Sequence, residues 1–149
     1  MRSGVRCSIS ASSWTTVTTP GGRALDLVEL AAVACAAYDA EFPDERERYG
    51  PAGMLWCRHD NQHLLNWAVL SLRSEVDFEH QLAWLARVME ARDFPLARLA
   101  RDLEILADTV VRRHPEERVL PVRLLSGAAF VSSRAGAGAG GSDAAGLPG

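Results

Sequence analysis

Residues Leu96–Arg113 read LARLARDLEILADTVVRR and give the strongest indication of the fold class. Apolar residues recur there at intervals of three and four, at Leu96, Leu99, Leu103, Leu106 and Val110. This spacing is the period of an amphipathic helix. The other side of the helix carries charged residues, which we expect to pair across one turn, Arg98 with Asp102 and Asp108 with Arg112. Asp93-Phe94-Pro95 marks the start of this helix.

The helical period continues on both sides of this segment. Upstream it predicts helices at Ala24–Phe42, Ala52–Arg73 and Val76–Arg92, and downstream a shorter element from His114, which Pro121 should bend or break. Tyr49-Gly50-Pro51 is typical of a turn before the second helix, and Ser74 followed by Asp77 of a capping arrangement before the third. The sequence therefore predicts an all-α fold, a compact bundle of four main helices plus a shorter fifth helical element, with disordered termini.

The two ends of the chain differ in composition from the predicted helices. Residues 1–22 are rich in Ser and Thr, and we expect a flexible leader with at most a short strand at Trp14–Thr18 that has no obvious partner. The helical domain is expected at residues 23–131. Residues 132–149 are rich in Ala and Gly, which predicts a disordered tail.

Composition narrows the classes of function. All 16 basic residues are arginine, so mechanisms that need a lysine amine are excluded. A net charge of -3 argues against nucleic-acid binding. A helix-turn-helix within Leu96–Arg113 is disfavoured by Glu104 at the turn position, where the helix should continue. The absence of a long apolar run predicts no membrane span. Three widely spaced cysteines, Cys7, Cys35 and Cys57, favour a cytoplasmic protein without disulfides.

The segment from Arg58 to His63 carries the only cluster of residues suited to chemistry. His59 and His63 are one helical turn apart, and Asp60-x-x-His63 has the same spacing as Asp77-x-x-His80 on the next predicted helix. Carboxylate and histidine at this spacing on two helices are typical of dinuclear iron or manganese bundles. The candidate metal ligands are therefore His59, Asp60, His63, Asp77 and His80, for iron, manganese or zinc, or for a haem through one axial histidine.

A structural interpretation of the same residues competes with metal binding. A histidine and an aspartate beside Asn61 and a tryptophan can form a hydrogen-bond network that fixes the helix in its packing, with Asp60 paired to Arg87 or Arg92. Asp77 can simply cap a helix. Pairing of Cys57 with His59 for catalysis is not assured, because the two side chains are adjacent in sequence and a buried thiol is inert.

These observations predict a non-catalytic cytoplasmic helical module with a regulatory, adaptor or sensor role. It would bind a protein partner or a second copy of itself. The alternative is a helical bundle that binds a metal or a tetrapyrrole through the His/Asp cluster. The charged stretch Asp39–Arg48, with Tyr38, Phe42 and Tyr49 around it, is either a solvated connector or a docking surface for a partner.

Overall fold

The computed structural model describes residues 15–145, and the side chains of residues 15–137. It contains a short hairpin of β1 (Thr16–Thr18) and β2 (Ala24–Asp26), followed by α2 (Leu27–Glu41), α3 (Asp44–Leu72), α4 (Phe78–Ala91), α5 (Leu96–Arg113) and α6 (Val119–Ala145). The all-α class is confirmed. No helix of this described part is long and apolar enough to cross a membrane.

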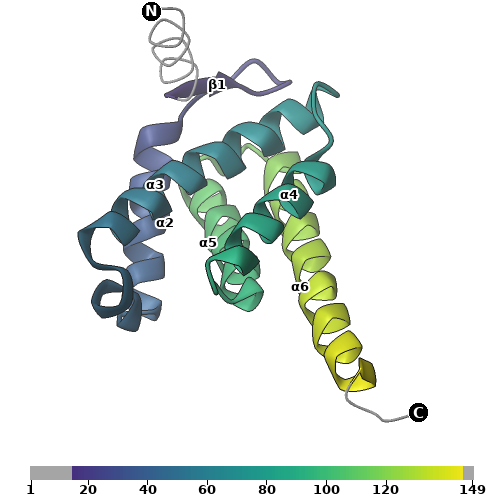
Figure 1. Cartoon of the computed structure of the whole chain (residues 1–149). Helices are drawn as coiled ribbons and strands as arrows, with labels where there is room; N and C mark the ends of the chain where they lie inside the picture. The colour runs from purple at the N-terminus through teal and green to yellow at the C-terminus, as the bar shows by residue number, and fades with distance from the viewer. Residues whose placement is uncertain (1–14, 146–149) are drawn as a thin grey trace, which may run out of the picture.

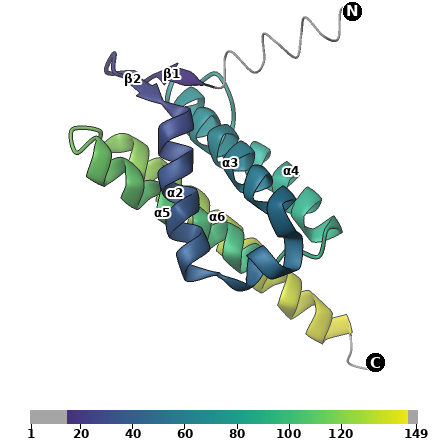
Figure 2. The same cartoon turned by 90° about the vertical axis from the view of Figure 1, so that its left-hand side faces the viewer.

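Two helix pairs and one bridging helix make up the bundle (Figure 1). The helix α2 packs on α3, α5 packs along α6, and α4 contacts α3, α5 and α6. A view turned by 90° shows α2 crossing in front of α5 and α6 (Figure 2). Because α5 contacts every other helix, its apolar stripe lies at the centre of the core. Of that stripe, Leu103, Leu106 and Val110 are fully buried.

Two helix starts and one kink follow from local chemistry. Asp26 caps α2 by accepting a hydrogen bond from the Glu29 amide at 3.0 Å, and Asp77 caps α4 by accepting one from the His80 amide at 3.1 Å. The predicted cap is therefore displaced from Ser74 to Asp77. The expected turn at Gly50 is present as a sharp kink inside α3, with φ 64° and ψ −159°, a conformation that favours glycine.

Three expectations about the elements are wrong. Ala24–Asp26 is not the first turn of a helix but the strand β2, which pairs with β1. The sequence had offered no partner for that first strand. The charged run Asp44–Arg48 is helical rather than a loop. The fifth element is not short but is the long helix α6. Pro121 does not break it, because this residue lies in the first turn, where a backbone N–H group would have no acceptor within the helix. Its C-terminal part extends beyond the other helices (Figure 1).

The expected domain limits stay predictions. β1 lies within the expected leader of residues 1–22, and α6 continues into the expected tail of residues 132–149. The remainder of the leader, residues 1–14, and the last residues, 146–149, lie outside the described part of the chain.

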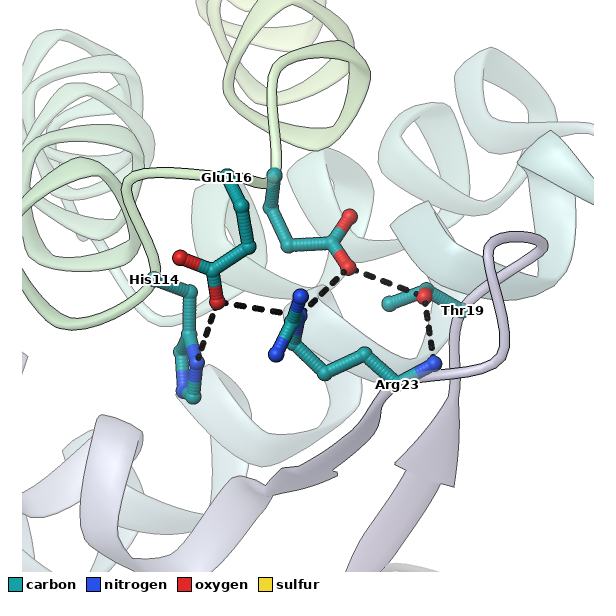
Figure 3. A network of polar contacts seen from close by, with 5 residues as sticks. Thr19, Arg23, His114 and Glu116 are labelled. Carbon is teal, nitrogen blue, oxygen red and sulfur yellow. Dashed lines mark hydrogen bonds and ion pairs between the residues drawn. The ribbon is translucent and has the colours of Figure 1, made fainter.

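A network of polar contacts fastens the hairpin to the turn between α5 and α6 (Figure 3). The Arg23 Nε lies 3.0 Å from Glu116 Oε1 and 3.3 Å from Glu117 Oε1. The Thr19 hydroxyl donates to Glu117 at 2.9 Å and accepts from the Arg23 amide at 3.2 Å. His114 Nδ1 lies 3.7 Å from Glu116. These contacts join two segments almost a hundred residues apart, so the hairpin is part of the folded domain.

Close packing of α6 on α4 depends on Gly127. A Cβ added there would lie 2.7 Å from a Phe78 ring carbon and 2.8 Å from a Leu82 methyl, and both of these side chains are buried. We expect Gly127→Ala to lower the free energy of unfolding by about 1–3 kcal/mol through overpacking. Urea denaturation followed by circular dichroism measures this change.

Gly136→Ala is the matched control on the same helix. A Cβ at Gly136 meets no atom within 4 Å. This substitution should leave stability unchanged or raise it by about 0.5–1 kcal/mol, because alanine favours a helix more than glycine does. Equal effects of the two substitutions would contradict the packing of α6 on α4 described above.

Candidate functional site

A cavity lies between α2, the kinked half of α3, the end of α4 and the start of α5. Its volume is about 70 Å³, and it opens to solvent on one side. A site that holds one water molecule needs about 10–15 Å³, so this cavity has room for about five water molecules or a small organic molecule. Its wall is aromatic and apolar with carboxyl groups at intervals, and consists of Tyr38, Glu45, Tyr49, Gly53, Trp56, Cys57, Asp60, Met89, Arg92, Phe94, Leu99 and Asp102.

The kink in α3 places most of this wall. The positive φ of Gly50 redirects the chain between the helical turn Asp44–Tyr49 and the long helical segment after Pro51. As a result Glu45 and Tyr49 face the same cavity as Trp56 and Asp60, which follow on the next turns of the helix. The aromatic rings stand around Tyr49, whose centroid is 6.2 Å from that of Trp56 and 6.2 Å from that of Phe94.

Asp102 is the most buried acid of the site, with only 8% of the residue exposed. The pKa of its carboxyl group is raised to about 8, mainly by burial, with a lowering effect of the hydrogen bond with Asn61 and smaller rises from the nearby charges of Asp60 and Glu45. The expected Arg98–Asp102 pair is therefore wrong. Arg98 reaches across to α3 and binds Glu45 at 2.9 Å and Asp44 at 3.0 Å, whereas the expected Asp108–Arg112 pair is present at 3.0 Å.

Asn61, which is fully buried, connects Asp102 with two thiols. In one amide orientation its Nδ2 donates to Cys35 Sγ at 3.2 Å and Cys57 Sγ at 3.7 Å, and a protonated Asp102 then donates to the amide oxygen. In the other, favoured when Asp102 is ionised, Nδ2 donates to both Asp102 oxygens, at 3.2 Å for Oδ1. The amide oxygen then accepts from the thiols. A 180° turn of the Asn61 side-chain amide therefore lets it hydrogen-bond with either the protonated or the ionised form of Asp102.

The two thiols belong to this network. Cys35 and Cys57 are free, and the pKa of the Cys57 thiol is raised by its hydrogen bond with Cys35 and by burial, with neighbouring Asp102 and Asp60 adding to the effect. A thiol held protonated at neutral pH is a poor nucleophile. This supports the expectation that Cys57 does not act with His59 in catalysis.

Tyr38 and Tyr49 complete the polar wall of the cavity. The Tyr38 hydroxyl donates a short hydrogen bond to Glu45, and burial is the first cause of its raised pKa. The Tyr49 hydroxyl is buried and finds no hydrogen-bond partner among the described residues. A buried hydroxyl without a partner is costly, which indicates a site where another molecule supplies the missing partner.

Of the five predicted metal ligands, one lines the cavity. Asp60 does so, and burial raises its pKa to about 6 in spite of the nearby charges of His59 and Arg92. His59 Nδ1 lies 4.0 Å from Asp60 Oδ1, and the His59 and His63 rings meet edge to face at 4.6 Å. Burial and the charge of His59 lower the pKa of His63 to about 4.

Asp77 and His80 lie elsewhere, at the exposed start of α4, where Asp77 accepts from the His80 amide. Within residues 15–137 no three His, Cys, Asp or Glu side chains are grouped so that they hold a metal ion. The assignment of metal or haem ligands stays a prediction, which an absorption spectrum and elemental analysis of protein purified without an affinity tag would test.

Asp102 was not predicted as a site residue, Asn61 was predicted only as part of a structural hydrogen-bond network, and Tyr49 only beside the charged stretch Asp39–Arg48. A signal for Asp102 exists in the sequence, because it lies three residues after Leu99 and four before Leu106, at the edge of the apolar stripe. Nothing comparable marks Tyr49, whose position depends on the kink at Gly50.

Comparison with known proteins adds no functional assignment. No protein-family model matches the chain, and searches of curated proteins and of solved structures found no significant match.

Proposed function

We propose that this protein is a non-catalytic sensor module that binds a small ligand in the cavity between α2, α3, α4 and α5. The observation that carries the proposal is the convergence, in one partly open cavity, of aromatic side chains with the Asp60 and Asp102 carboxyl groups and the partnerless Tyr49 hydroxyl. Apolar walls with a few converging polar groups are the usual composition of a ligand site.

A binding role is favoured over catalysis by the state of the polar groups. The thiol of Cys57 is held protonated, and Glu45 is engaged by Arg98 and by the Tyr38 hydroxyl. Neither is available as a nucleophile or as a base. The remaining acids, Asp60 and Asp102, suit recognition of a ligand by charge and hydrogen bonds.

A regulatory protein also needs an output surface, and for this part we propose a protein partner or a second copy of the chain in the cytoplasm. Support comes from three exposed apolar side chains on one face of α6, Val119, Val122 and Leu125. Light scattering at increasing protein concentration tests self-association.

The ligand site is tested with methionine methyl NMR. Met89 lines the cavity, while Met54 is not in its lining and lies beside an adjoining smaller hollow that shares Tyr38, Glu45 and Cys57 with it. Each methionine gives one methyl resonance, which the variants M54L and M89L assign. We expect members of a small-fragment library to shift the Met89 resonance saturably, with a smaller effect on Met54. If no fragment shifts Met89 selectively, the proposed ligand site is wrong.

A further inference from the structure

Acidic residues outnumber basic residues on the cavity wall. Three acids, Glu45, Asp60 and Asp102, line the cavity with one basic residue, Arg92. Glu45 has its own cation, because Arg98 binds it at 2.9 Å. The guanidinium of Arg92 lies 5.3 Å from the centre of the Trp56 ring, and its charge lowers the pKa of Asp60. Asp60 has His59 Nδ1 at 4.0 Å and the charge of Arg92 nearby. Asp102 forms no ion pair within 4 Å among the described residues and is held by Asn61 alone.

The aromatic residues of the wall also favour positive charge. Aromatic faces attract cations through the negative potential of the ring. Two rings of the cavity each attract an arginine in this way. Arg92 lies over the Trp56 ring, and the guanidinium carbon of Arg48 lies 5.6 Å from the centre of the Tyr49 ring. The buried Tyr49 hydroxyl can accept a hydrogen bond from an N–H group.

The size of the cavity selects among cations. A volume of about 70 Å³ is small for most metabolites. The described acids are not grouped closely enough to coordinate one metal ion. A cation that satisfies separated carboxyl groups and also fills the apolar part of the cavity needs N–H donors and a short alkyl portion.

We infer that the cavity binds a small organic ammonium ion of roughly four to six heavy atoms. Its N–H groups face Asp60, Asp102 and the Tyr49 hydroxyl, and its alkyl portion contacts Trp56, Met89 and Phe94. This inference rests on the proposed function and names the ligand class for the same cavity.

Binding of a cation is linked to the protonation of the two acids. Burial raises the pKa values of Asp60 to about 6 and of Asp102 to about 8, and a bound ammonium ion lowers both. Affinity should therefore rise as the pH increases from 5.5 to 8.5, a range in which a primary alkylammonium stays charged. The other ionisable groups that interact with these acids are Tyr38, Glu45, Cys57, His59 and Arg92.

The test compares isobutylammonium with isobutanol, which has the same number of heavy atoms and the same branching but no charge. Both are titrated into the full chain at pH 7.5, with the Met89 methyl resonance as the readout. We expect isobutylammonium to bind at least tenfold more tightly than isobutanol. We also expect its affinity to fall at least tenfold in the double variant D60N/D102N and on lowering the pH to 5.5.

The matched control is D108N, an Asp-to-Asn change on the same helix as Asp102, at an exposed position paired with Arg112. It should leave the affinity unchanged, and the methyl spectrum shows whether each variant is folded. Equal binding of the alcohol and the ammonium ion, or an affinity that the double variant does not change, overturns the ammonium inference. The proposed ligand site itself fails only if the fragment library also leaves Met89 unshifted.

Discussion

Replacing Asn61 with alanine should lower the free energy of unfolding by about 2–4 kcal/mol. Asn61 has no exposed surface and hydrogen-bonds a buried carboxyl group and two thiols. Its loss leaves the Asp102 carboxyl group buried without its partner and opens a void between α2, α3 and α5. Urea denaturation at pH 7, followed by circular dichroism, measures the change.

A control and a double variant separate the stability lost with the hydrogen bonds of Asn61 from the stability lost through the void. Asn66→Ala, on the same helix and only half-buried, should cost less than about 1 kcal/mol. Asn61→Leu should destabilise the fold because Asp102 loses its partner, and adding Asp102→Leu should recover much of that loss because both polar groups are then gone. Additive effects of the two leucine substitutions would show that Asn61 and Asp102 do not interact.

The second large effect is a decline of stability with rising pH that depends on Asp102. Its pKa is about 8 in the folded protein against an ordinary 3.8, so the folded state holds an extra proton between these values. The free energy of unfolding therefore falls as the pH rises from about 4 to about 8. Asp60, with a pKa of about 6, acts in the same direction over the lower part of this window.

His63 acts in the opposite direction. Its pKa is lowered from 6.5 to about 4, so the unfolded state holds the extra proton and stability rises as the pH increases through that range. Above pH 6.5 the effects of His63 and Asp60 are nearly complete, and the decline due to Asp102 remains. The contribution of this acid is therefore best measured between pH 6.5 and 8.5.

We expect the wild-type protein to lose about 1–2 kcal/mol of stability between pH 6.5 and 8.5. In Asp102→Asn this decline should largely disappear, because the amide does not ionise. The exposed variant Asp108→Asn should retain the decline. A wild-type stability that is flat or rises over this interval would falsify the protonated state assigned to Asp102.

The helices were largely predictable from the sequence because their cause is local. The apolar period of Leu96–Arg113 and the proline before it predict α5 within its observed bounds. The turn at Gly50 was predictable because only glycine tolerates the required φ readily. The hairpin was not predictable, since the three residues of β2 complete the helical period of α2 and pair with β1 only once both are placed on the bundle.

The candidate site was predicted only in part. The sequence predicted Asp60 and its neighbours on α3 as candidate site residues, because polar residues on an otherwise apolar helix require partners. It assigned Asp102 to the wrong face, since an acid one turn from Arg98 fits a surface ion pair equally well. The long-range pairing of Arg98 with Asp44 and Glu45 removes that arginine from Asp102 and leaves the acid buried.

The sequence by itself determined the all-α class, the extent of α5, the turn at Gly50 and the lack of lysine, because period, backbone freedom and composition are local properties. Only the tertiary structure decided which polar groups converge. The distance between Asp60 on α3 and Asp102 on α5 depends on how the helices cross, and so do the burial and the raised pKa values of these acids. These quantities arise from long-range packing and desolvation, which no local spacing in the chain encodes.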